Sequence, residues 1–181
     1  MVCQDIRFFR RNLSRTFAVA IVTAGLGLAG QGAAQAQNAA TAMASNPDLS
    51  QWSYIVGQAG LKMAAATNPV TVFALTDKGF NDINAVWHGA LKTPGASGSP
   101  NYQKMQQLVR SQAILGLHPP SEFDGKKVTL TSVAGTPITV DGTVQGKLTV
   151  EMKYATGAVS GMPMVSDQSV IYPIVASDVH P

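Results

Sequence analysis

The chain has 181 residues, of which 45% are hydrophobic and 13% charged, so it is long and apolar enough for one domain with a packed core. Its formal net charge of +3 arises in the first thirty-six residues, because the remainder carries nine of the thirteen bases and nine of the ten acids. The basic isoelectric point is therefore no argument for nucleic-acid binding, and we expect no nucleic-acid partner.

Residues 1–36 have the organisation of an export signal. Arginines precede an apolar run from Phe17 to Ala29, and Ala34-Gln35-Ala36 places small residues where a signal peptidase reads them. The apolar run is shorter than the roughly 20 residues that a membrane-spanning helix needs. We expect cleavage between Ala36 and Gln37 and a periplasmic or secreted protein without a transmembrane span. An uncleaved anchor and, from Arg10-Arg11, twin-arginine export are the alternatives.

Cys3 is the only cysteine and it precedes the apolar run, so it is not a lipoprotein cysteine and would leave with the signal. The mature chain then has no disulfide and no cysteine metal site. Residues 37–47 are aperiodic and rich in alanine and asparagine, and we expect a flexible leader there. The single domain is expected over residues 48–181.

A helix is predicted to begin at Asn46-Pro47, with the asparagine as cap and the proline in the first turn. Apolar side chains then recur at spacings of three and four residues and form one stripe: Leu49, Trp52, Ile55, Val56, Ala59 and Met63.

The next stretch, Thr71 to Phe80, changes from strand to helix. β-Branched and aromatic side chains suit residues 71–74 to a short buried strand. Thr76 or Asp77 supplies an oxygen that can cap free backbone N–H groups, and the charge of Asp77 suits a helix N-terminus. The apolar side chains that follow have helical spacing: Phe80, Ile83, and Val86 with Trp87.

This string, TVFALTDKGF, resembles the first signature box of the fasciclin-type adhesion domain, which is close to TVFAPTDxAF. Leu75 replaces the usual Pro and Gly79 a usual Ala. The resemblance implies a secreted or surface-held α+β wedge built on an antiparallel β-sandwich, with the helices at one side and mostly in the N-terminal half. The signature residues that it assigns here are Thr71, Val72, Phe73, Thr76, Asp77 and Phe80.

Residues 88–99 have the composition of a loop, and Ser99-Pro100 begins another helix. The apolar side of that helix is formed by Tyr102, Met105, Leu108, Val109 and Ala113.

From Lys127 the pattern alternates with a period of two. Residues 128–131 and 137–140 read as two strands, and Asp141-Gly142 as a turn. Residues 147–154 have one apolar and one polar face, as in an antiparallel sheet, and residues 157–163 read as a loop. A last strand is predicted over residues 170–175, where Pro173 indicates an edge or a bulge. Helices followed by strands is an α+β order.

The last strand resembles a second fasciclin box, close to NGVIHVIDxVLxP, in which Val170, Ile171 and Ile174 match in type. Tyr172 stands where His is usual, and Val175 where Asp is usual. The family's central Tyr-His pair falls on Ser111-Gln112 and is absent. The integrin-binding role attached to that pair is therefore not transferred to this chain.

The residues suggest no catalytic, cofactor or metal site. His88, His118 and His180 are not spaced as metal ligands, and we expect the first at a helix end and the other two in solvent. Residues 95–99 lack the Gly-x-Ser-x-Gly spacing. Asp77 and Asp82 lie five residues apart and do not share a helix face, and Asp141-Gly142 lacks the further acidic ligands of a calcium loop.

Two functions remain open. The first is a non-catalytic adhesion or matrix-binding module outside the cytoplasm, with an unknown protein or polysaccharide partner, for example in a biofilm. The second is an exported carrier or enzyme with a pocket between sheet and helices, in which polar residues such as Ser97, His118 or Tyr172 would converge. No cofactor is expected for either.

Overall fold

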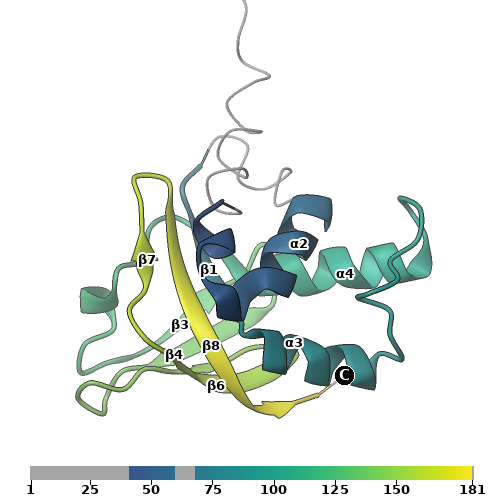
Figure 1. Ribbon diagram of the computed structural model, residues 1–181. Helices are drawn as coiled ribbons and strands as arrows, with labels where there is room; N and C mark the ends of the chain where they lie inside the picture. Colours follow the sequence, from purple (N-terminus) through teal and green to yellow (C-terminus); the bar gives the residue numbers. More distant parts are fainter. Residues whose placement is uncertain (1–40, 60–67, 181) are drawn as a thin grey trace, which may run out of the picture.

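The computed structural model describes residues 41–59 and 68–180 (Figure 1). The predicted export signal, its cleavage point at Ala36 and Gln37, and Met63 of the first helix lie outside these residues. Within them, no helix combines the length and the apolar character that crossing a membrane requires.

Helices dominate the first half of the described chain and strands the second half, in the order expected for an α+β fold. The elements are η1 (Pro47–Leu49), α2 (Ser50–Ala59), β1 (Val70–Leu75), α3 (Asp77–Val86), α4 (Pro100–Ser111), β2 (Ala113–Leu115), η3 (Pro120–Glu122), β3 (Lys127–Thr131), β4 (Pro137–Asp141), β5 (Thr149–Glu151), β6 (Ala155–Val159), β7 (Met164–Val165) and β8 (Ser169–Val179).

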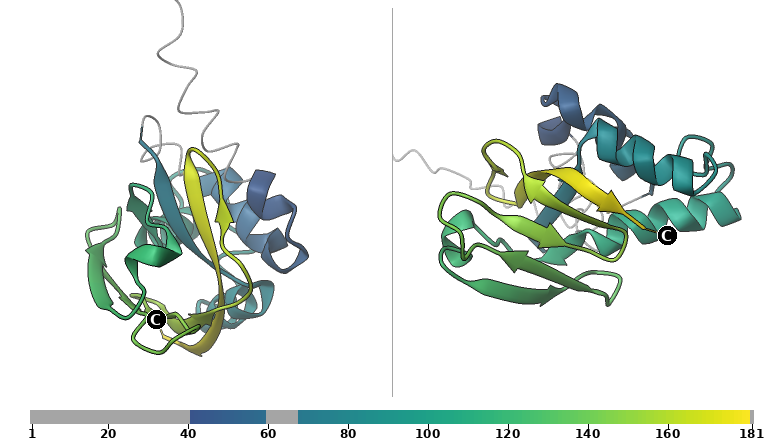
Figure 2. Two further views of the ribbon diagram at one scale, coloured as in Figure 1. Left: turned by 90° about the vertical axis from the view of Figure 1, so that its left-hand side faces the viewer. Right: turned by 90° about the horizontal axis from the view of Figure 1, so that it is seen from below.

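The strands form one strongly curved sheet in the order β2-β1-β8-β6-β5-β4-β3, with β7 paired to β8, and α2, α3 and α4 lie together at one side of it (Figures 1 and 2). The expected antiparallel sandwich is not confirmed, because the sheet is mixed and nearly barrel-shaped. Its parallel pair is β1 with β8. Both strands are apolar and buried along their shared length, which is typical of parallel strands covered on both faces.

The single strand predicted over residues 147–154 is wrong in extent. β5 ends at Glu151, the chain turns, and β6 begins at Ala155 and pairs antiparallel with β5. The sequence predicted one strand because the alternation of apolar and polar side chains continues through the turn. Met152 and Tyr154 are buried there, whereas Lys153 between them is exposed. The first three of the seven residues expected as a loop over 157–163 therefore belong to strand β6.

Pro173 does not mark an edge, because β8 lies between β1 and β6. Pro173 pairs with Ala74 of β1. On its other side β6 ends at Val159 and β7 begins at Met164, and the Ser160 N–H donates to the Pro173 carbonyl (2.8 Å). A central strand tolerates proline here because the missing N–H faces the junction between two short neighbours.

The flexible leader expected over residues 37–47 is wrong from residue 41 onward. Residues 41–44 are helical, and the Met43 side chain is completely buried in the core. Asn46 caps the turn that follows, because its side chain accepts from the Asp48 N–H (3.0 Å). This segment therefore belongs to the folded domain.

Candidate functional site

The signature residues lie at the junction of β1 with α3. Thr71, Val72 and Phe73 are completely buried, and Phe80 on the first turn of α3 is almost so. The Phe73 ring stacks on the Tyr172 ring, with centroids 5.1 Å apart. Because strand and helix share this core, these buried signature residues serve the fold.

Asp77 caps a helix, although not the one it begins. Its Oδ1 accepts from the Gln51 backbone N–H (2.9 Å), and its Oδ2 accepts from the Ser50 hydroxyl. Both partners are in the first turn of α2, whereas Thr76 occupies the N-cap position of α3 without a side-chain hydrogen bond. Asp77 therefore caps a free backbone N–H group, as predicted, but this group belongs to α2 and not to the helix behind Asp77. Asp77 thereby joins α2 to the β1–α3 junction. Because Gln51 and Asp77 lie 26 residues apart in the sequence, no local pattern predicts this contact.

The second resembling box lies directly beside the first. Val170, Ile171 and Ile174 of β8 pair in parallel register with Thr71, Val72 and Leu75 of β1. The two boxes come from opposite ends of the domain, and their pairing closes the core around Phe73 and Tyr172.

Tyr172 and His118 belong to one hydrogen-bonded network. The Tyr172 hydroxyl donates to the His118 carbonyl (2.6 Å), and the His118 N–H donates to Thr71 Oγ1 (2.9 Å). The His118 ring contacts the Glu122 carboxylate (3.0 Å) and is mostly buried, so the expectation of a solvated His118 is wrong. Burial and then the charge of Glu122 raise the pKa of Tyr172, which keeps its hydroxyl a donor. The network fixes the segment between β2 and β3 against the sheet.

At the position of the family's Tyr-His pair, Ser111 and Gln112 are both buried. The Ser111 hydroxyl donates to the Leu108 carbonyl (2.7 Å). The Gln112 amide oxygen and nitrogen have no hydrogen-bond partner among the described residues. A buried amide without partners is a cost to stability and not a surface for a ligand.

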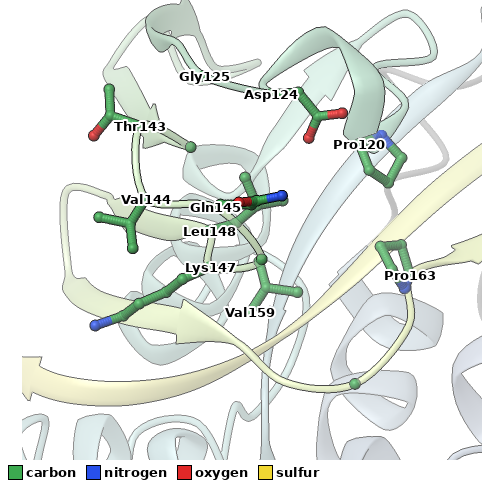
Figure 3. A pocket seen from close by; sticks show the side chains of 13 residues that line it. Pro120, Asp124, Gly125, Thr143, Val144, Gln145, Lys147, Leu148, Val159 and Pro163 are labelled. Atoms are coloured by element: carbon green, nitrogen blue, oxygen red, sulfur yellow. The ribbon is translucent and has the colours of Figure 1, made fainter.

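A pocket of about 530 Å³ opens at the end of the sheet away from the helices (Figure 3). Three segments form it: the η3 turn and the residues after it, the β4–β5 loop, and the β6–β7 loop. The lining residues are Pro120, Asp124, Gly125, Gly142, Thr143, Val144, Gln145, Gly146, Lys147, Leu148, Val159, Gly161 and Pro163. The volume lies in the range of about 300–1,000 Å³ that is usual for small-molecule sites.

Backbone contacts hold two of these segments together. The Gly125 N–H donates to the Gly142 carbonyl (3.0 Å), and the Gly142 N–H donates to the Lys126 carbonyl (2.8 Å). A Cβ atom at Gly142 would lie 2.2 Å from the Phe123 carbonyl oxygen, so this approach requires glycine. The next turn is fixed by Asp141, which accepts from the Thr143 hydroxyl and N–H; these bonds, with Lys127 nearby, lower the pKa of Asp141. The base of the pocket is therefore preformed.

Three other polar side chains of the pocket are free by contrast. Within residues 41–59 and 68–180, Asp124, Gln145 and Lys147 have no side-chain hydrogen bond or ion pair. An apolar side chain of the lining, that of Val144, is 61% exposed. The sequence reading missed this pocket because its residues come from three loops.

The other candidates from the sequence do not form a site. His88 is exposed just after α3, and His180 contacts the Met152 carbonyl (3.3 Å). Ser97 neither lines the pocket nor joins the His118 network, and Ser99 serves as the N-cap of α4. No group of three metal-ligating side chains occurs in the part of the chain that the structure describes.

No protein-family model and no curated protein matches the chain. Among solved structures it is similar to a FAS1 domain pair from the insect cell adhesion molecule fasciclin I, with a TM-score of 0.57 and 16% sequence identity. The chain folds as a fasciclin-like domain. The match covers 73% of this chain and 45% of that one, so the chain spans less than half of the domain pair. At this identity the likeness establishes the fold and not the role.

Proposed function

We propose that this fasciclin-like domain is a non-catalytic adhesion module that works outside the cytoplasm and binds a component of a surface or matrix. The main support is the fold, which it shares with a domain pair of a cell adhesion molecule. The export signal predicted at residues 1–36 supports a place outside the cytoplasm. The pocket beside Asp124 and Gln145 offers unpartnered polar groups to a ligand.

Deletion of the gene tests this function. Cells without the protein are expected to attach less to surfaces and to aggregate less, and the wild-type gene is expected to restore both properties. Mass spectrometry of the exported protein checks cleavage after Ala36. Unchanged attachment across several surfaces would contradict the adhesive role.

The pocket volume also supports a second candidate, an exported carrier or enzyme for a small ligand. His118 and Tyr172, which that hypothesis places in a pocket, instead hydrogen-bond to each other behind the η3 wall. A thermal-shift screen with sugars, lipids and aromatic acids separates the two candidates, because a ligand that binds only the native state raises the melting temperature. A large shift with one free small molecule and normal attachment of the deletion strain would favour the carrier.

A further inference from the structure

We propose that the pocket between η3 and the β4–β5 and β6–β7 loops binds an uncharged saccharide segment of the surface or matrix. The inference rests on the proposed adhesive function and names the ligand class at its site. It starts from the arrangement of the lining side chains in Figure 3, where polar groups and flat apolar groups line the same opening.

The charges of the pocket disfavour an ionic ligand. Among the described residues, Asp124 is the only carboxylate that lines it, whereas a divalent cation takes several oxygen ligands. Lys147 is the only base among the thirteen described residues of the lining, and its side chain extends away from the others (Figure 3). An anion would therefore meet Asp124 without a close positive charge to balance it.

The free polar groups match hydroxyl groups. The Asp124 carboxylate accepts hydrogen bonds, and the Gln145 amide both donates and accepts. Gln145 extends across the opening toward the wall that carries Asp124 and Pro120 (Figure 3). A sugar ring presents hydroxyl groups that donate and accept, so both side chains find partners on it.

The apolar groups match the other surface of a sugar ring. Pro120 and Pro163 lie on the same side of the opening, and Leu148 and Val159 complete the apolar lining (Figure 3). None of the thirteen lining residues is aromatic, so an extended aromatic ligand would have no ring to stack on. The C–H groups of a pyranose can instead pack on the proline rings and aliphatic side chains.

The test titrates the isotope-labelled protein with three neutral tetrasaccharides, namely cellotetraose, tetra-N-acetylchitotetraose and maltotetraose. Tetragalacturonate serves as an anionic probe and tetra-alanine as a peptide probe. At least one neutral tetrasaccharide is expected to shift the backbone amide resonances of Gly125, Gly142 and Gly146. Gln145→Ala and Asp124→Asn are each expected to weaken that binding about tenfold, which corresponds to about 1.4 kcal/mol.

Matched controls come from the helical side of the molecule. Gln58→Ala and Asp48→Asn change the same residue types at exposed positions outside the pocket, and binding is expected to stay within twofold of the wild type. Thermal unfolding checks that all four variants remain folded.

The inference would be overturned if no neutral tetrasaccharide moved the pocket resonances at millimolar concentration, if only tetragalacturonate or tetra-alanine bound, or if pocket and control variants bound equally. If one of these outcomes is found but gene deletion still reduces attachment, the saccharide inference is rejected and the adhesive function is still supported. Saccharide binding in the pocket together with unchanged attachment of the deletion strain would instead support the ligand class and reject the adhesive function.

Discussion

The two ends of the domain use polar side chains in opposite ways. At the β1–α3 junction, Asp77 accepts two hydrogen bonds from α2, and Tyr172 donates one to the segment after β2. At the pocket, backbone groups and the Asp141–Thr143 pair hold the loops, whereas the side chains of Asp124 and Gln145 have no partner in the described part of the chain. This difference indicates that the junction sustains the fold, and it supports the proposal that the loops carry a binding surface.

The largest contrast is expected between Phe73 and Val144. Phe73→Ala removes a completely buried ring stacked on Tyr172 and should lower the free energy of unfolding by about 3–5 kcal/mol. Val144→Ala, at an exposed rim position, should change it by less than about 0.5 kcal/mol. Urea unfolding of both variants measures the two changes in the free energy of unfolding. Similar losses would show that the junction and the pocket rim contribute equally to stability.

The next contrast compares two glycines. Gly142→Ala should cost about 1–3 kcal/mol, because the added Cβ would press on the Phe123 carbonyl where the pocket walls meet. Gly57→Ala in α2 meets no atom within 4 Å and should raise stability by about 0.5–1 kcal/mol through helix propensity. Chemical denaturation compares the two variants. If Gly142→Ala left the free energy of unfolding unchanged, the chain at Gly142 would not be in close contact with Phe123.

The junction makes a smaller prediction at Asp77. Asp77→Ala removes the cap of α2 and should lower the unfolding free energy by about 1–2 kcal/mol. Asp82→Ala, which breaks an exposed pair with Lys78, is the control and should cost about 0–1 kcal/mol. In a double-mutant cycle, Asp77→Ala and Ser50→Ala should not be additive. Additivity would show that the carboxylate and the hydroxyl do not interact.

The smallest change in the free energy of unfolding is expected at Gln112, where a substitution should stabilise the protein. Gln112→Met replaces a buried amide without partners by an apolar side chain of similar shape and should raise stability by about 1 kcal/mol. Differential scanning calorimetry reports this as a higher melting temperature. A lower melting temperature would mean that the amide has a partner, such as a buried water molecule.

The sequence predicted those parts of the fold that depend on local patterns. The strand and helix around Phe73 and Phe80, the caps Asn46 and Ser99, and the hairpin of β3 and β4 are present as expected. The parallel pairing of β1 with β8 joins segments that are far apart in the sequence, and the local periodicity of side chains does not predict such pairs.

The pocket was not predictable for the same reason. Asp124, Gln145 and Pro163 come from three loops, and none of these loops has a motif that marks it as a binding site. Asp77 was recognised as a capping residue, but its target lies in α2 and is set by tertiary packing. Local sequence patterns therefore indicated which side chains matter at the junction, but they did not predict the pocket.

The most direct test of the account is attachment by cells that lack their own copy of the gene and express a pocket variant. The double variant Asp124→Asn with Gln145→Ala is compared with Asp48→Asn with Gln58→Ala, both exported in equal amounts. We expect the control variant to restore attachment and the pocket variant to restore little of it. Equal restoration by the two variants would contradict the claim that this domain adheres through its loop pocket.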